Sequence, residues 1–168
     1  MNILKYYKMN EDVKEPIFAT DGSACFDICA SIKDNEPITV YRMRNLKVQV
    51  NPINKTIRIA PGDRVLIPTG LIFDIPECHS VRLHIRSSVS LKKGLTMPNG
   101  EGIIDSDYYH QTFVMLHNAS ADEVLIENGE RIAQGELIQT YDYAVTETEN
   151  IPEQKTNRVG GFGSTGVK

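Results

Sequence analysis

The sequence predicts one all-β domain, a compact barrel or jelly roll of short strands with a single short helix. Apolar and β-branched runs recur along the chain, separated by turn signals such as PGD at 61–63 and PNG at 98–100. No helical apolar period lasts beyond two turns. A length of 168 residues suits one domain with a substantial core.

The expected elements follow from these local patterns. The helix is expected over 87–93, where SSVSLKK opens with serine and is followed by Gly94. The strands are expected at the apolar runs, which lie at residues 46–50, 56–60, 64–68, 71–75, 81–85, 112–116 and 123–126.

Two segments differ in composition from this pattern. Residues 31–55 are polar around the run LKVQV and are expected to form a hairpin inserted in a domain of residues 1–151. Residues 152–168 carry few apolar side chains, and the stretch 158–166 holds four glycines. Such a tail cannot pack by itself, so we expect a flexible C-terminal arm that is ordered only by a ligand.

Charge and composition limit the partners and the compartment. The net charge of -4 argues against a general binder of nucleic acid or of anionic membranes, so any phosphate site must be local. The first ten residues lack the apolar core of an export signal. Cys25, Cys29 and Cys78 form no Cys-x-x-Cys pair, and we expect them to be buried in a cytoplasmic protein.

Three segments carry side chains suited to chemistry. In GIIDSDY at 102–108, two carboxylates stand at i and i+2, and in a strand they would share one face. RSS at 86–88 offers a guanidinium and hydroxyls, which suit phosphate oxygens. The tail adds a second arginine, an aromatic ring and hydroxyls. Each signal is weak alone.

Together and in this order, five segments resemble the five motifs of the trimeric dUTPases. They are GSACFD at 22–27, RSSVSLKKG at 86–94, NGEGIIDSDY at 99–108, GERIAQ at 129–134 and RVGGFGSTG at 158–166. PTGL at 68–71 is a further turn similar to that family. The resemblance spans residues 18–166.

The resemblance implies a β-clip fold, a homotrimer with shared active sites and a hydrolase of nucleotide metabolism. The implied reaction is hydrolysis of dUTP to dUMP and pyrophosphate by Mg²⁺-assisted attack of water on the α-phosphorus. It lowers dUTP and supplies dUMP for thymidylate synthesis. An isolated monomer would be inactive.

The third motif supplies the implied base and the nucleoside pocket. Asp105 resembles the general base, although it could instead cap a turn. Tyr108 resembles the ring under the deoxyribose, where it would exclude a 2′-OH, although it could be an ordinary strand tyrosine. Asn99 and the backbone at Gly102 and Ile104 resemble the uracil pocket, whose main-chain groups match uracil and mismatch cytosine.

The second and fourth motifs supply the implied phosphate contacts, through Arg86, Ser87, Ser88 and Gln134. Gln134 could alternatively be an ordinary strand residue. Asp27, in the first motif, resembles the carboxylate that reaches Mg²⁺ through a water. A structural strand-end residue is the alternative.

The fifth motif resembles an arm that closes over the nucleotide. Its Arg158 would contact the γ-phosphate and assist turnover, and Phe162 would stack on uracil. Residues Gly163, Ser164 and Thr165 would add phosphate contacts.

The chain departs from the family pattern at three points. Tyr109 and His110 replace the usual polar residue and glycine after Tyr108. The arm has one residue fewer between its arginine and GFG. Residues 31–55 exceed the family's minimal connection; they could be a surface hairpin, or an element that binds a regulatory protein partner or lies at the trimer edge.

Two other functions fit parts of the sequence. A dCTP deaminase would share the fold and the RSS segment, but it needs a glutamate beside the base, where TFVML stands at 112–116. A binding protein could retain the dUTPase scaffold and contact a regulator through 31–55. The presence of every motif side chain favours the hydrolase.

Overall fold

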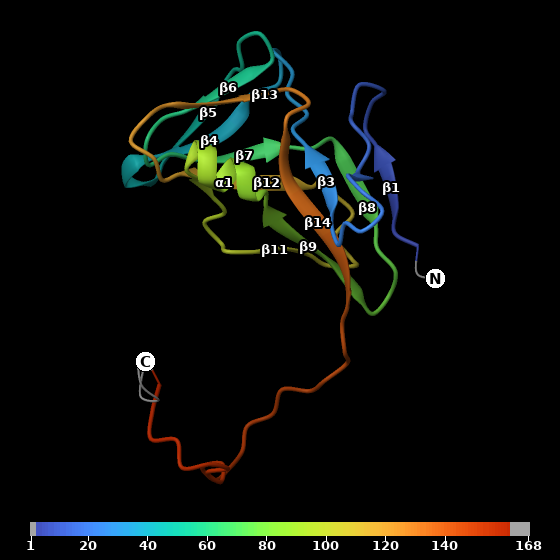
Figure 1. Cartoon of the computed structure of the whole chain (residues 1–168), viewed down its shortest axis with the longest axis vertical. Coiled ribbons are helices and arrows are strands. Elements are labelled where there is room, and N and C mark those ends of the chain that lie inside the picture. The colour runs from blue at the N-terminus through green and yellow to red at the C-terminus, as the bar shows by residue number, and fades with distance from the viewer. Residues whose placement is uncertain (1–2, 162–168) are drawn as a thin grey trace.

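The computed structural model describes residues 3–161, and short strands make up most of its folded part (Figure 1). The helices are α1 (Ser87–Lys93) and the 3₁₀ turn η1 (Met43–Asn45). The strands are β1 (Lys5–Lys8), β2 (Ile17–Phe18), β3 (Phe26–Cys29), β4 (Ile38–Arg42), β5 (Leu46–Val50), β6 (Thr56–Ile59), β7 (Arg64–Pro68), β8 (Leu71–Asp74), β9 (His79–Ile85), β10 (Leu95–Thr96), β11 (Gly102–Ile104), β12 (Phe113–Asn118), β13 (Val124–Glu127) and β14 (Arg131–Gln139).

Two five-stranded antiparallel sheets enclose one core. Their strand orders are β10-β12-β7-β4-β5 and β11-β9-β14-β3-β2, and β1-β8 and β13-β6 form two smaller pairs. Buried side chains alternate along the strands, as in β7 and β12, because successive residues point to opposite faces. The all-β prediction with one short α-helix is confirmed. Among the described residues, strand pairing leaves both large sheets open, so they do not form a closed barrel.

The expected strands all form, with small shifts at their ends. The longest strand, β14, was not predicted. It pairs with β9 on one side and β3 on the other, so it lies in the middle of its sheet. Gly135 interrupts its apolar pattern because a Cβ there would lie 2.7 Å from the Phe26 ring. The close packing against Phe26 therefore requires glycine, and this glycine makes the strand hard to recognise in the sequence.

Helix α1 occupies the expected residues. Gly94 ends it with a φ of 63°, and its N–H donates to the Ser90 carbonyl at 3.0 Å. The cap at the first turn is Arg86, without a side-chain capping bond, so serine does not cap the helix as the sequence suggested. Lys93 Nζ donates to the Leu125 carbonyl at 2.8 Å, which ties the helix to β13.

Residues 31–55 contain the expected hairpin, formed by β4 and β5. The hairpin is built into the domain, because β4 also pairs with β7 and buries Ile38 and Val40 in the core. Arg44 and Asn45 in its turn have φ values of 62° and 61°. Its role in binding a regulator stays a prediction.

The last strand ends at Gln139, and the Thr140 N–H donates to the Cys78 carbonyl at 2.7 Å; the expected domain boundary at 151 stays a prediction. Beyond Thr140 the chain runs away from the sheets (Figure 1). Tyr141, Tyr143 and Val145 are 78%, 83% and 90% exposed on this segment. The rest of the predicted arm, with Phe162, Gly163, Ser164 and Thr165, lies outside the described residues.

The cysteines are less buried than expected. Cys78 is exposed, and Cys25 and Cys29 are only partly buried. Burial, followed by the nearby Asp27 carboxylate, raises the pKa of the Cys29 thiol. Within residues 3–161, no helix has the length and apolarity needed to span a bilayer.

Candidate active site

An apolar pocket of about 330 Å³ lies beside β11. Its size is within the range of small-ligand sites. The lining includes five of the predicted site residues: Asn99, Gly102, Ile104, Asp105 and Tyr108. Apolar side chains complete the lining, among them Leu66, Leu83, Met97, Phe113 and Met115. The structure thus gathers the third motif around one recess.

Asp105 directly follows β11 and lies at the edge of this pocket. The strand ends at Ile104, so Asp105 and Asp107 lie in a turn rather than on one strand face as expected. The Tyr108 N–H donates to the Asp105 carbonyl at 3.1 Å and closes the turn. Asp105 is exposed, and among the described residues its carboxylate has no hydrogen bond or ion pair. Its carboxylate is therefore open to solvent.

Tyr108 lies on the same turn and is held at both its ring and its hydroxyl. The hydroxyl donates to the Gln111 carbonyl at 3.0 Å. The ring meets the His110 ring edge-on, with 5.7 Å between their centroids. Tyr109 and His110, which depart from the family pattern, are therefore compatible with a closed turn that presents Tyr108 to the pocket.

The backbone of β11 can read a base. The strand is at the edge of its sheet and pairs only with β9 among the described strands, through Gly102 and its two successors. An edge strand leaves alternate N–H and C=O groups free for a ligand. Gly102 lets the strand approach closely, since a Cβ there would lie 2.9 Å from Leu83 Cβ. β11 therefore packs closely on β9 and also offers free main-chain groups to the pocket.

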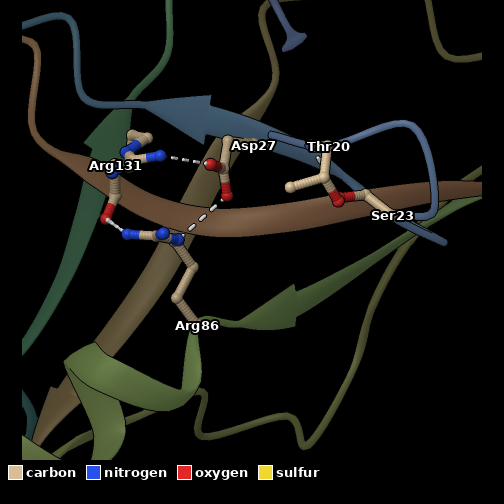
Figure 2. A network of polar contacts seen from close by, with 5 residues as sticks. All are labelled: Thr20, Ser23, Asp27, Arg86 and Arg131. Atoms are coloured by element: carbon tan, nitrogen blue, oxygen red, sulfur yellow. Dashed lines mark hydrogen bonds and ion pairs between the residues drawn. The ribbon is translucent and has the colours of Figure 1, made fainter. Parts of the chain in front are cut away.

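A second group of predicted residues surrounds the buried carboxylate of Asp27 (Figure 2). Arg86 Nε lies 2.9 Å from one carboxylate oxygen, and Arg131 Nη1 donates to the other at 2.9 Å. The Thr20–Ser23 turn leads into β3, which carries Asp27 (Figure 2). Asp27 therefore holds two guanidinium groups side by side.

Gln134 and the two serines lie near this cluster. Gln134 is the β14 partner of Asp27, and directly opposed antiparallel residues share a face. Ser87 and Ser88 begin α1 directly after Arg86, and both are exposed. These residues could hold an anionic group, although none of them lines the pocket beside Asp105. The predicted site is thus divided into two parts in this chain.

Sequence reasoning did not single out Arg131. Its signal was present, because it stands in GERIAQ three residues before Gln134. What the sequence could not show was the register that sets β14 against β3 and brings Arg131 to Asp27. The side chain of Arg131 is 47% exposed, so it remains partly open to solvent.

The described side chains could contribute only part of the ligands of a metal ion. Within residues 3–161, no group of three or more His, Cys, Asp or Glu side chains is placed to hold an ion. Both oxygens of Asp27 face arginines. Mg²⁺ keeps several waters and is often held by substrate phosphates with one or two carboxylates. The residues fit an ion held mainly by a polyphosphate.

Arg158 is the one arm residue of the prediction that the structure describes. Its Nε donates to the Gly160 carbonyl at 2.7 Å, and its N–H donates to Thr156 Oγ1 at 3.3 Å. Both contacts are local, and the residue is exposed on the segment that leaves the body. In this chain Arg158 contacts neither part of the divided site.

An apolar recess with a free backbone edge, a carboxylate at its rim and a separate arginine cluster suits a base, a reacting centre and phosphates. This arrangement on an all-β scaffold places the protein in the class of nucleotide-binding enzymes.

Comparison with known proteins identifies the family. The dUTPase family model matches residues 52–166. The deoxyuridine 5′-triphosphate nucleotidohydrolase of Caulobacter vibrioides is 34% identical over 163 residues, covering 97% of this chain and 92% of that protein. The protein of the same name from Hydrogenobaculum is 34% identical, covering 96% of each chain. The chain belongs to the dUTPase family.

Solved structures support the same fold. The Staphylococcus bacteriophage 80alpha dUTPase with dUpNHpp superposes with a TM-score of 0.76, at 22% identity, covering 99% of this chain and all of that one. The Streptococcus mutans dUTPase gives a TM-score of 0.65 at 24% identity, with 84% and 98% covered. A point mutant of the dUTPase from phage phi11 of S. aureus, with a TM-score of 0.69 at 18% identity and coverage of 90% and 100%, coordinates a structural Mg(II) ion.

Proposed function

We propose that this protein is a dUTP diphosphatase, which hydrolyses dUTP to dUMP and pyrophosphate. The observation that carries the proposal is the unpaired, exposed carboxylate of Asp105 at the rim of a nucleoside-sized pocket. The family assignment supplies the substrate. The pocket adds a reason against deamination at the base, because Asp105 is the one carboxylate among the described residues that line it.

In the proposed reaction, Asp105 accepts a proton from a water whose oxygen attacks the α-phosphorus. A P–O bond forms to that water, and the bond from the α-phosphorus to the bridging oxygen breaks, so pyrophosphate leaves with the electron pair. A positioned general base contributes about 10²–10⁴-fold to such a step. Arg86, Ser87, Ser88 and Gln134 bind the phosphates.

The nucleoside half of the pocket selects the substrate. Main-chain groups of Gly102 and Ile104, with Asn99, pair with uracil, and cytosine would leave buried groups unpaired. Tyr108 packs against the deoxyribose. A ribose 2′-OH would meet the ring and be buried without a partner, at a cost of about 1–3 kcal/mol.

The division of the site into two parts supports a homotrimer with shared sites. The pocket of one subunit would be completed by phosphate-binding residues from a neighbour. Residues 140–161 leave their own body with Tyr141, Tyr143 and Val145 exposed, as expected for a segment that packs on another copy. Arg158, Phe162, Gly163, Ser164 and Thr165 would then close over the nucleotide of another subunit.

Mg²⁺ is the proposed cofactor. Bound to the triphosphate, it would neutralise phosphate charge and make the leaving group more stable. Asp27 is the proposed residue that reaches the ion through a water, which requires Arg86 or Arg131 to give up one carboxylate oxygen. Such an exchange is reasonable if Arg86 turns from Asp27 to the phosphates when substrate binds.

Pyrophosphate and ammonia release from dUTP, dCTP, dTTP, dATP, dGTP and UTP will test the function. The expected result is rapid pyrophosphate release from dUTP alone, dependent on Mg²⁺. Ammonia release from dCTP would replace the proposal with deamination. No release from any nucleotide would leave only a binding role for the scaffold.

A further inference from the structure

The turn that carries Asp105 and Tyr108 is anchored at its far end by Gln111. The backbone carbonyl of Gln111 accepts the Tyr108 hydroxyl at 3.0 Å. The side-chain Oε1 of the same residue accepts the Gly70 N–H at 2.9 Å. Gln111 is partly buried, whereas Tyr108 is 37% exposed. Gln111 thus links the exposed Tyr108 ring to Gly70.

The interior end of this link is closely packed. Gly70, in the 69–71 turn, has a φ of 69°, and a Cβ added there would lie 2.4 Å from Val13 Cγ2, so Val13 packs directly against the Gly70 backbone and leaves no space for a side chain. The same turn holds Thr112, which is fully buried: Thr69 Oγ1 donates to its carbonyl at 2.6 Å, and its N–H donates to the Leu71 carbonyl at 2.8 Å. Gln111 extends this packed structure to the surface.

We propose that Gln111 is a positioning residue for sugar selection, which holds Tyr108 in place through its bond to the 69–71 turn. The inference rests on the proposed dUTP hydrolysis. An exposed ring excludes a 2′-OH only if it cannot swing away, because rotation would open space for the extra hydroxyl. The bond from Gly70 N–H fixes the Gln111 backbone, and that backbone fixes the Tyr108 hydroxyl.

A purely structural role would have a different consequence. If Gln111 only stabilised the fold, its loss would lower turnover of dUTP and UTP together and leave their ratio unchanged. A positioning role instead predicts that kcat/KM for UTP rises while kcat for dUTP changes little. The ratio of the two kcat/KM values is therefore the informative readout.

The test compares Gln111→Met with Gln111→Glu. Methionine keeps the length of the side chain and loses the acceptor, whereas glutamate keeps an oxygen for the Gly70 N–H. We expect Gln111→Met to reduce the dUTP/UTP ratio by about three- to tenfold, the effect of losing one hydrogen bond, and Gln111→Glu to restore most of it. Gln49→Met is the matched control, since it removes the bond to Thr39 on the neighbouring hairpin.

Tyr108→Phe tests the other end of the link and decides the matter alone if Gln111→Met fails to fold. It should reduce the ratio as much as Gln111→Met, and the double variant should add little, because both break one chain of contacts. An unchanged ratio in Gln111→Met or in Tyr108→Phe, or equal losses in the Met and Glu variants, overturns the inference. Failure of the wild-type protein to release pyrophosphate from dUTP would instead overturn the proposed function.

Discussion

At the scale of single residues, Asp105 and Asp27 are carboxylates in opposite environments. Asp105 is exposed and unpaired among the described residues, so its carboxylate is open to solvent. Asp27 is buried, and in this chain each of its carboxylate oxygens pairs with a guanidinium group. The proposed roles differ accordingly: Asp105 is the proposed general base, and Asp27 is the proposed organiser of the phosphate-binding side chains and of Mg²⁺.

Asp105→Asn should lower kcat for dUTP by at least about 10²-fold, because asparagine cannot accept the proton. The binding of dUpNHpp should be nearly unchanged, since the shape of the pocket is retained. Asp107→Asn is the control: its carboxylate lies in the same turn but does not line the pocket. Near-normal turnover in Asp105→Asn, measured as pyrophosphate release, would remove Asp105 from the mechanism.

Asp27→Asn should lower the free energy of unfolding by about 1–3 kcal/mol in metal-free buffer, because two guanidinium groups lose their shared counter-ion. Urea denaturation monitored by circular dichroism will measure it. Asp74→Asn is the control, since its pair with Lys5 is exposed and 3.8 Å long and should contribute little. An unchanged stability with EDTA present would favour a role for Asp27 at the metal alone.

At the scale of elements, the sequence predicted the strands that contain an apolar run and the helix that ends at a glycine. The runs that became β7 and β12 alternate in side-chain exposure, and Gly94 marked the end of α1. β14 was missed because Gly135 and its polar neighbours interrupt the kind of apolar run that marked the expected strands. β10 and β11 are too short for any periodicity to be visible.

The candidate site was predictable to a similar extent. Its members could be chosen by resemblance to the family, and the pocket brings five of them together. The division into two groups could not be foreseen, because it depends on sheet order. The pairing of Arg131 with Asp27 depends on the register between β14 and β3, which no local pattern encodes.

The segment after β14 should be the first part of the chain cut by trypsin. Lys155 and Arg158 lie on exposed backbone with only local hydrogen bonds, and such segments are preferred cleavage sites. Mg²⁺ with dUpNHpp should slow cleavage after Arg158 if the arm closes over the nucleotide. Mass spectrometry of timed digests will locate the cuts, with Arg64 in β7 as a protected reference. Equal rates with and without nucleotide would argue against closure.

At the scale of the whole molecule, the proposed homotrimer with shared sites predicts that assembly is required for activity. The pocket beside Asp105 and the cluster around Asp27 are separate in one chain, and the segment that follows β14 runs away from the sheets (Figure 1). If neighbours complete each site, the catalytic carboxylate and the arm at one nucleotide come from different subunits.

Mixing two inactive variants tests this directly. Asp105→Asn lacks the base, and a chain truncated after residue 156 lacks the arm but keeps every core side chain. If the two groups act from different subunits, co-expressed mixed trimers should contain sites with an intact base and an intact arm. A working site then needs the base of a truncated chain and the arm of an Asp105→Asn chain that follows it in the ring. In a cyclic trimer that holds both variants this order occurs once, so about one site in three is intact.

Co-expression with two different affinity tags and sequential purification will isolate the mixed assemblies. Pyrophosphate release from dUTP should then recover to about one third of the wild-type rate per site, while each variant alone stays inactive. If base and arm belonged to one subunit, no chain in the mixture would carry both and activity would not return. Mixing after separate purification, without time for subunit exchange, is the control: activity appearing there would point to contamination rather than shared sites.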